Sequence, residues 1–435
     1  MSKQRRPATS QRTSVELFAG AGGLAMAAER AGFRPLLLNE FAKRACETLV
    51  ANGAASYEGA ECPPIPAIGD KPPLIMGDVR NVKFDYLVDK VDLLAGGPPC
   101  QPFSLGGVAR GDEDDRNGFP HMFRAISEMR PRAVICENVR GLLRPSFSPY
   151  FDYIKRELSL PWLKRPEGSD WRDHNETLRA EMKSASIHDD ERYEVEHFAV
   201  NAADYGVPQI RNRVIIVAFR RDLGVDWNWF RKLVKPKFSE RLLYQDMLPN
   251  GAYWDRHEIP SSLRKPVPNK SQVFQQAALL PEDEGLAPWR TLRDAIRGIE
   301  DGQEPLPEIP SHLLDRQPHF GDPDHVGWPN ARIYDGHTPN QLDRPAKTVK
   351  AGVHGVPGGE SVVQLDDGTH RYMTVRETAR VMTFPDQRTL AGPRGEKMRQ
   401  LGNAVPVLLG KAFTEAVSMA LELAGGDEAK ESSGR

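Results

Sequence analysis

One cysteine is placed where a nucleophile could act. Cys100 lies in the run GGPPCQPFS, residues 96–104, directly after an apolar segment that predicts a strand. Two prolines stiffen the backbone before it, and the carboxyl end of a strand is where open α/β sheets bind ligands. A lone cysteine is more often a small buried apolar residue. The glycines and prolines around Cys100 favour the interpretation as a nucleophile over that as a buried apolar residue. The charged, glycine-rich segment 104–118 that follows is expected to be a mobile lid.

A carboxylate and two arginines could act on the same substrate. Glu137 closes the next predicted strand, at the same sheet edge as Cys100, where it could hold a proton on a ring nitrogen of a heteroaromatic substrate. Taken alone, it fits a helix cap or a salt bridge equally well. Arg211 and Arg213 alternate in QIRNR, so they should point to one face and could clamp a carboxylate and a base oxygen.

Three other segments have features of a nucleotide site. The predicted strand Val15–Ala19 runs into GAGG, residues 20–23, where glycines admit a ligand and a helix N-terminus offers N–H groups. Glu40 ends the next strand, where an acid can accept hydrogen bonds from ribose hydroxyls. Asp78 follows a third strand and could pair with an adenine amine or cap a turn. The glycines depart from G-x-G-x-x-G, so a tight turn without a ligand remains open.

A sheet is needed to bring these residues together. From Val15 to about Phe219, apolar runs alternate with helix-like segments, which predicts a doubly wound α/β domain with helices on both faces. The expected strands are Val15–Ala19, Leu36–Asn39, Leu74–Met76, Val91–Ala95, Ala133–Glu137 and Val214–Phe219. The expected helices are Leu24–Arg30, Phe41–Val50, His121–Met129 and Pro406–Leu423, the last ending before Gly425-Gly426. Residues 57–73 and about 159–192 interrupt the pattern as surface additions.

Composition excludes several other classes of protein. No run of about 18 apolar residues could span a membrane and no signal peptide is present, so a soluble, cytoplasmic protein is expected. The four cysteines are scattered without zinc-ligand spacing, which predicts neither a metal site nor disulfides. The net charge of −2 argues against a uniformly basic nucleic-acid wrapper but allows a local basic groove.

The motifs form an ordered series along the chain. They are FAGAGG, NE, GDV, GGPPCQPFS, ENV, QIRNR, RPAKTV, TVRETARVMTFPD and QLGNAVP. This series resembles the cytosine-5 DNA methyltransferases of bacterial restriction-modification systems, over nearly the whole chain outside the two additions and the region between QIRNR and RPAKTV. The resemblance implies a Rossmann-like S-adenosylmethionine-dependent methyltransferase sheet with a smaller target-recognition domain.

The resemblance also implies a covalent mechanism on a cytosine flipped out of DNA. Cys100 would add to carbon 6, Glu137 would hold the protonated N3, and Arg213, with Arg211 beside it, would bind the ring oxygen and orient Glu137. Glu40 would bind the ribose of the donor, Phe41 would stack on its adenine, and Asp78 would meet the adenine amine. The full set of implied donor contacts is Phe18, Gly20, Gly22, Gly23, Leu24, Glu40, Phe41, Asp78, Val79, Asn403 and Val405.

The implied domain plan places the recognition region inside the catalytic one. Residues 11–241 would form the catalytic domain, with an insertion near 159–192, residues 242–384 the target-recognition domain and hinge, and residues 385–425 the return to the catalytic domain. Residues 1–10 and 426–435 are expected to be disordered. The expected partner of a monomeric chain is double-stranded DNA, with a companion restriction endonuclease. Phosphate contacts are expected from the basic run Arg220, Arg221, Arg231, Lys232, Lys235, Lys237 and Arg241.

Three other functions were weighed against DNA methylation. A tRNA cytosine methyltransferase of the same family would share these motifs, but the long region between QIRNR and RPAKTV favours DNA. A zinc deaminase needs P-C-x-x-C and H-x-E, which the sequence around Cys100 lacks. A catalytically silent DNA-binding regulator should have lost its nucleophile or its donor site, yet Cys100, Glu137, Arg213 and the glycine turn are all present. The sequence does not predict the DNA target.

Overall fold

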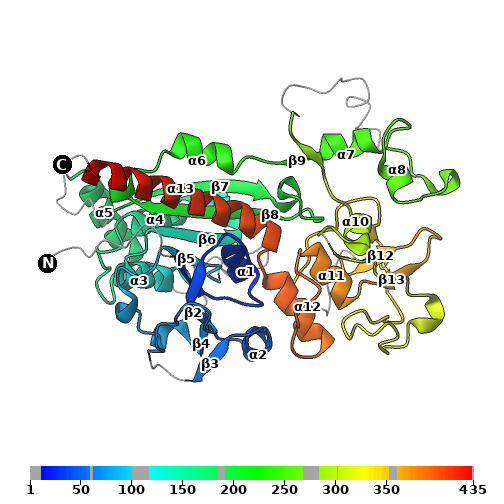
Figure 1. Cartoon of the computed structure of the whole chain (residues 1–435), viewed down its shortest axis with the longest axis horizontal. Coiled ribbons are helices and arrows are strands. Elements are labelled where there is room, and N and C mark those ends of the chain that lie inside the picture. Colours follow the sequence, from blue (N-terminus) through cyan, green and yellow to red (C-terminus); the bar gives the residue numbers. More distant parts are fainter. Residues whose placement is uncertain are drawn as a thin grey trace. The chain divides into compact units, whose positions relative to one another are not determined.

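The chain folds into two compact units. A computed structural model describes residues 11–58, 62–99, 117–184, 192–267, 284–300, 302–351 and 360–433 (Figure 1). Unit 1 consists of Met1–Val200, Asn212–Val234 and Gly410–Arg435, and unit 2 of Asn201–Arg211 and Lys235–Leu409. Compared with the domain plan from the sequence, unit 2 additionally contains Asn201–Arg211, residues 235–241 and residues 385–409. The predicted disordered N-terminus, residues 1–10, lies outside the described residues.

Unit 1 is built on an eight-stranded sheet with the order β3-β4-β2-β1-β5-β6-β8-β7. Its strands are β1 Thr13–Leu17, β2 Arg34–Glu40, β3 Ala55–Glu58, β4 Pro73–Met76, β5 Leu93–Gly96, β6 Ala133–Val139, β7 Tyr193–Asn201 and β8 Asn212–Arg220. Each neighbouring pair of strands from β3 to β6 in this order is parallel. Strand β8, in contrast, runs antiparallel to β6. All six predicted strands are present, and the sequence analysis missed β3 and β7.

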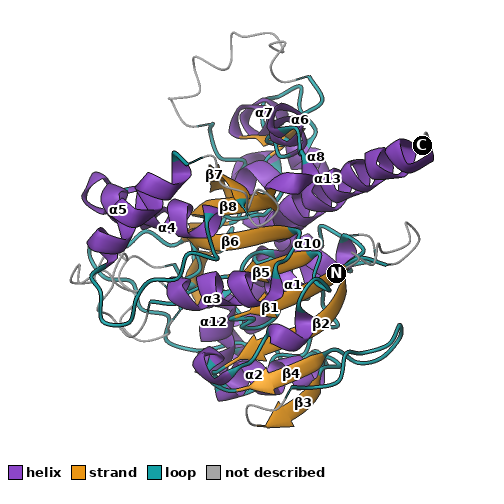
Figure 2. Ribbon diagram, turned by 90° about the vertical axis from the view of Figure 1, so that its left-hand side faces the viewer, coloured by secondary structure: helices purple, strands orange, loops and turns teal. Residues whose placement is uncertain are grey.

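Helices cover both faces of this sheet, as the doubly wound prediction requires. The helices of unit 1 are α1 Gly23–Arg30, α2 Lys43–Ala51, α3 Phe119–Met129, α4 Ser148–Ser159, α5 Trp171–Met182 and α6 Trp227–Leu233 (Figure 2). Successive strand residues point to opposite faces. Leu38 and Leu74 accordingly pack with α1 and α2, while Leu37 and Ile75 join the core beneath α3 and α4. The predicted fold class is confirmed.

The C-terminal helix is longer than predicted. α13 runs from Val407 to Ser433, so the expected helix end before Gly425-Gly426 is wrong. Alanine, glutamate and lysine after the two glycines are good helix formers and let the helix continue. Thr414 donates to the carbonyl of Ala27 on α1, which joins the two ends of the chain.

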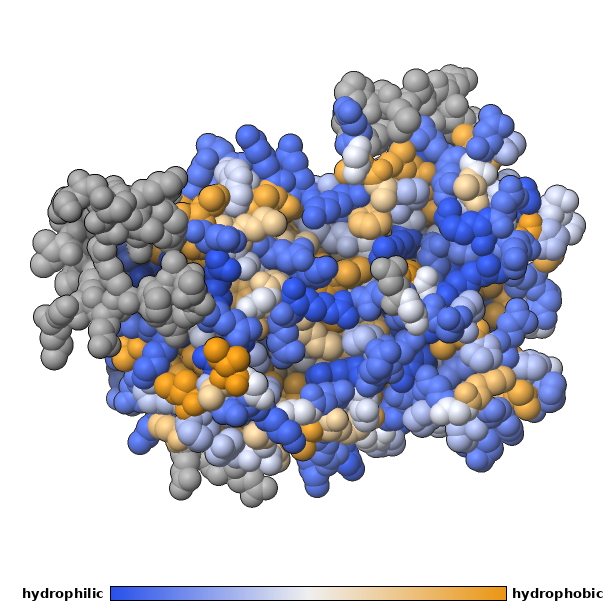
Figure 3. All heavy atoms as spheres, viewed as in Figure 1, coloured by the Kyte–Doolittle hydropathy of each residue, from blue (hydrophilic) through white to orange (hydrophobic). Residues whose placement is uncertain are grey.

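One stretch of the described chain has the length and composition to cross a membrane. It is Arg394–Ala424, and 67% of its most apolar 18-residue window is buried within the protein. Phe413, Val417 and Leu421 of α13 are nearly inaccessible. These apolar residues therefore belong to the protein core, and hydrophilic residues predominate on the face seen in Figure 3.

Unit 2 combines short elements with long irregular segments. Its strands are β9 Phe238–Ser239, β10 Ala287–Pro288, β11 Asn340–Gln341, β12 Val362–Gln364 and β13 His370–Tyr372. Its helices are α7 Glu240–Asp246, α8 Tyr253–Arg256, α10 Leu292–Arg297, α11 Val375–Val381 and α12 Arg394–Asn403. Residues 208–210 join it because Ile210 N–H donates to the Ala346 carbonyl and Ala346 N–H to the Pro208 carbonyl.

Candidate active site

The segment that leads into the predicted nucleophile is fixed at the carboxyl end of β5. Asn138 Nδ2 donates to the Pro98 carbonyl at 3.1 Å, and Gly118 N–H donates to the Pro99 carbonyl at 2.9 Å. A Cβ at Gly118 would lie 2.6 Å from Pro99 Cδ, so only glycine fits there. Cys100 itself and lid residues up to 116 lie outside the described residues. The chain is therefore anchored on both sides of them.

Glu137 and Arg213 form an ion pair at this sheet edge. Arg213 Nε lies 2.6 Å from Glu137 Oε1, and the two side chains are only 12% and 10% exposed. The strand register explains the pair: Glu137 lies opposite Ile215 on β8, and Arg213, two residues earlier, is on the same face. Gly97 lies alongside, since a Cβ there would be 3.7 Å from Glu137 Oε2. A carboxylate is thus held next to the segment that carries Cys100.

Arg211 has a different environment from Arg213. Its side chain is 1% exposed, and its guanidinium donates to the carbonyls of Val349, Gly402 and Ala404 at 2.8–3.0 Å. Each of these partners lies in unit 2, whereas Arg213 and Glu137 lie in unit 1. Arg211 therefore uses its guanidinium on backbone carbonyls far away in the sequence, and its role on the ring beside Arg213 stays a prediction.

The glycine turn after β1 is joined to Glu40. Phe18, Gly20 and Gly22 have positive φ angles of 57°, 55° and 83°, and Gly22 is the N-cap of α1. Glu40, 9% exposed, accepts from Gly20 N–H at 2.6 Å and from the N–H groups of the next two residues at 2.8 and 2.7 Å. The carboxylate is therefore fixed in orientation beside the turn that follows β1.

The other predicted donor residues of unit 1 fall into two groups. The Phe41 side chain is 76% exposed, which is unusual for a phenylalanine and leaves its ring free to stack. Asp78 caps the 3₁₀ helix Val79–Asn81 and binds Arg80, which lowers the pKa of its carboxyl group. Leu24 and Val79 are buried, so their side chains pack in the core.

The last two predicted donor residues lie in unit 2. Asn403 is the final residue of α12 and its side chain is exposed, whereas Val405 is 7% exposed. Their neighbours Gly402 and Ala404 provide two of the carbonyls that Arg211 binds. The side chain of Arg211, in the QIRNR motif, therefore binds the backbone of the GNAVP motif.

Two of the three described cysteines are poor nucleophiles. Cys46 and Cys136 are buried, and burial raises the pKa of each thiol to about 12. The third, Cys62, is exposed. In the described part of the chain, no three His, Cys, Asp or Glu side chains gather as metal ligands. Cys46 and Cys136 are therefore unsuited to act as nucleophiles.

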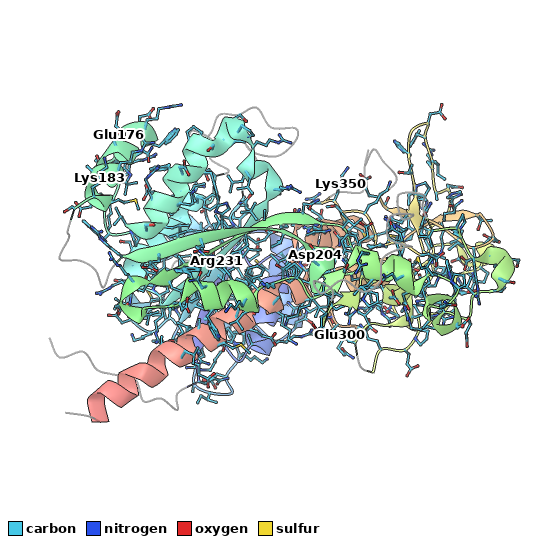
Figure 4. The ribbon with its side chains drawn as sticks, turned by 90° about the horizontal axis from the view of Figure 1, so that it is seen from above. Glu176, Lys183, Asp204, Arg231, Glu300 and Lys350 are labelled. Atoms are coloured by element: carbon cyan, nitrogen blue, oxygen red, sulfur yellow. The ribbon has the colours of Figure 1, made fainter. Side chains whose placement is uncertain are left out.

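Part of the predicted basic run already has acidic partners. Arg220 binds Asp222 at 2.7 Å, and Arg231, which projects from α6 (Figure 4), pairs with Glu196. Arg140, which the sequence analysis did not single out, is exposed directly after β6 and contacts Asn212 Oδ1 at 3.4 Å. Within the described residues no carboxylate forms an ion pair with it. Its place directly after ENV was the available signal.

Most of the chain matches a known family model. The model of the C-5 cytosine-specific DNA methylases covers residues 12–160 and 172–419. The chain belongs to the C-5 cytosine-specific DNA methylase family. This membership establishes a DNA cytosine-5 methyltransferase, and it implies DNA as substrate and S-adenosylmethionine as methyl donor. The residues outside the match include 161–171, in the insertion before α5.

Individual relatives agree with this assignment. The methylase is 31% identical over 409 residues to the type II methyltransferase M.Eco47II of Escherichia coli, covering 93% of this chain and 78% of that protein. It is 31% identical over 418 residues to the type II methyltransferase M.PspPI of a Psychrobacter species, covering 95% and 80%. DNMT2 of Spodoptera frugiperda has the same fold, with a TM-score of 0.52, 16% identity and coverage of 93% and 99%.

Asn138 is a positioning residue to which the sequence analysis gave no role. Its amide Nδ2 donates to the Pro98 carbonyl, and its Oδ1 accepts from its own neighbour, Val139 N–H. In the sequence, the signal for this role was a polar residue between a strand-end acid and a valine. The methylase thus uses both polar residues of this motif, one facing Arg213 and one holding the Cys100 segment.

Proposed function

We propose that this methylase transfers a methyl group to carbon 5 of a flipped cytosine in a specific duplex sequence, through a covalent adduct on Cys100. The observation that supports this most strongly is the Glu137–Arg213 ion pair beside Gly97, three residues before Cys100. A nucleophile, a proton-holding carboxylate and a cation are the groups that addition to a pyrimidine ring requires.

In the proposed reaction the Cys100 thiolate forms a bond to carbon 6 of the cytosine. Glu137 holds a proton at N3, so the ring accepts the electron pair and carbon 5 becomes nucleophilic. Arg213 binds the ring oxygen and keeps Glu137 in place. After carbon 5 has gained the methyl group, loss of its proton returns the electron pair to the ring and expels the Cys100 thiolate, which restores the enzyme.

The residues around the glycine turn fit the methyl donor. The donor supplies an activated methyl group on a sulfonium sulfur. Gly20 and Gly22 provide a close backbone approach, Glu40 presents an oriented carboxylate for the ribose, and the exposed Phe41 ring can stack on adenine. We further propose that Asp78, beside Arg80, meets the adenine amine, that Leu24 and Val79 contribute backbone, and that Asn403 and Val405 contact the methionine end.

The proposal extends to the biological role. Relatives named type II methyltransferases support a role in protecting host DNA from a companion restriction endonuclease. We also propose that the enzyme acts in the cytoplasm as a monomer. Arg140, exposed beside the ion pair, is placed to bind a DNA phosphate. Expression in a host without cytosine methylation, followed by bisulfite sequencing of the genome, would identify the target. Methylation of tRNA but not of duplex DNA would reject this proposal in favour of the RNA branch.

Substitution of the nucleophile tests the covalent step. We expect Cys100→Ser to abolish methylation of duplex DNA while donor and DNA dissociation constants stay within about threefold, because only the addition step is lost. Wild-type enzyme should also be trapped on DNA that carries 5-fluorocytosine, since fluorine cannot leave as the proton does. Cys62→Ser, at an exposed cysteine elsewhere, is the matched control and should retain activity. Unchanged turnover by Cys100→Ser would refute the covalent role.

A further inference from the structure

We infer that Arg211 is a positioning residue for the donor segment 402–405, and that it is not part of the base site. Its guanidinium binds the backbone on both sides of Asn403: Nη2 donates to the Gly402 carbonyl at 2.8 Å and to the Ala404 carbonyl at 3.0 Å. Asn403 lies between these fixed points with its side chain exposed. The inference rests on the proposed donor contact of Asn403.

The end of α12 explains why a cation is needed there. The last carbonyls of a helix have no partner within the helix, and the helix dipole places partial negative charge at that end. Gly402 and Ala404 belong to this end of α12, whose C-cap is Ala404. Arg211, at 1% exposure, supplies both hydrogen bonds and a compensating charge without water. Without it, these carbonyls would be buried and unsatisfied.

A third chain segment fixes the same junction. Arg211 Nη1 donates to the Val349 carbonyl at 2.9 Å, and Gln209 Oε1 accepts from Val349 N–H at 3.0 Å. Gly402 packs directly on the backbone of Lys350 and Ala351, which follow Val349. A Cβ at Gly402 would lie 2.4 Å from the Lys350 carbonyl carbon and from Ala351 N. Lys350 is labelled in Figure 4. The backbone at 402–404 is therefore held by a side chain on one side and by main chain on the other.

This geometry predicts which kinetic constant depends on Arg211. Release of the Gly402 and Ala404 carbonyls lets Asn403 leave its position, so donor binding should weaken. The Glu137–Arg213 pair has its own partners in unit 1 and does not use Arg211. The Michaelis constant for the donor should therefore rise, while the rate at saturating donor and the Michaelis constant for DNA should change little.

The experiment compares Arg211→Lys and Arg211→Met with wild type in the full-length chain. Donor dissociation constants are measured by calorimetry with S-adenosylmethionine alone, together with kcat, both Michaelis constants and the melting temperature. We expect the donor dissociation constant to rise at least tenfold in Arg211→Met and less in Arg211→Lys, which keeps the charge and part of the hydrogen bonding. The constants for DNA should stay within about threefold.

Two further variants separate positioning from general loosening. Arg380→Lys alters another buried arginine of unit 2. Arg380 lies on α11 and donates to the carbonyls of Ile296 and Glu304. The substitution should lower the melting temperature and leave donor affinity unchanged. Gly402→Ala displaces the segment without touching the arginine, so it should weaken donor binding as Arg211→Met does.

Three results would overturn the inference. One is normal donor affinity in both Arg211 variants, and another is an equal donor defect in Arg380→Lys at a matched loss of melting temperature. The third is a loss of kcat with unchanged donor affinity, which would return Arg211 to the base site. Failure of the proposed function looks different, because the unaltered chain would then bind no donor, and both proposals would fall.

Discussion

At the scale of single residues, the candidate site depends on charges that are mostly withdrawn from water. Glu137 and Arg213 are about nine-tenths buried and compensate each other. Removal of one partner from such a pair leaves an unpaired buried charge, which is costly. A test of function must therefore remove the chemistry of Glu137 while changing the fold as little as possible, and an amide does this.

We predict that Glu137→Gln lowers kcat by about 10²- to 10⁴-fold, the usual contribution of a positioned acid or base. Glutamine keeps the shape but cannot pass a proton to N3. Single-turnover methylation of duplex DNA at saturating donor measures the rate. Glu157→Gln is a matched control, because Glu157 is also a buried acid of unit 1. It lies on α4, and its Oε1 is 3.0 Å from Nδ1 of His174 on α5. Equal rates in Glu137→Gln and wild type would contradict the assignment.

At the scale of elements, α11 in TVRETARV shows how a motif stabilises unit 2. Thr374 and Glu377 form a capping box at its N-terminus, and Glu377 also pairs with Arg371 of β13 at 2.5 Å. Burial alone would raise the pKa of Glu377, but the Arg371 charge and the hydrogen bonds outweigh it and lower the pKa below its ordinary 4.5. Charge and cap act together, so the start of the helix requires the ionised acid.

The sign of this shift gives a pH-dependent prediction. A carboxyl group whose pKa is lower in the folded state than in the unfolded state stabilises the fold at pH values above its unfolded pKa. This stabilisation is lost as the pH falls through the folded pKa. Glu377→Gln should therefore lower the free energy of unfolding by about 3 kcal/mol at pH 7, and the difference from wild type should shrink below pH 4.5. Urea denaturation at pH 7 and pH 4 measures it.

The control for this prediction is a surface pair. Glu396→Gln removes the partner of Arg399, which is 59% exposed, so its effect should be within about 0.5 kcal/mol at either pH. A difference between Glu377→Gln and wild type that is equally large at pH 4 and pH 7 would show that the ionised form of Glu377 is not what stabilises the helix start.

At the scale of the whole molecule, a protein with a net charge of −2 must bind DNA through local groups of cations. Some arginines are already neutralised by carboxylates, as Arg220 and Arg231 are. Others, such as Arg140, are exposed at the carboxyl edge of the sheet beside the candidate site. Local placement therefore decides which cations can bind phosphate.

We predict that Arg140→Ala weakens DNA binding and reduces the slope of log K against log salt by about 1, the loss of one phosphate contact. Binding to a labelled duplex at several salt concentrations measures the slope. Arg179→Ala removes an arginine that pairs with Glu176 at 2.8 Å on α5 and should leave the slope unchanged. An unchanged slope in Arg140→Ala would show that this arginine does not contact DNA.

The sequence by itself determined the sheet, its two helical layers and the family. Strand alternation and glycine punctuation are local properties, readable within about ten residues, and so are motifs such as GGPPCQPFS. The elements that it missed have weaker patterns: β3, with the sequence ASYE, lacks an apolar run, and most positions of β7 are exposed or half-buried. Unit 2 has little regular structure, so local periodicity predicted none of its elements.

The tertiary structure decided what identical residue types do. Arg211 and Arg213 are two residues apart, and the sequence assigned both to the base. The folded chain places Arg213 against a carboxylate on the neighbouring strand and Arg211 against carbonyls 138, 191 and 193 residues away. Such partners come from chain closure over long loops, which no local pattern encodes. The sequence therefore identified the family, and only the three-dimensional contacts distinguished the arginine that faces Glu137 from the one that binds the backbone of residues 402–404.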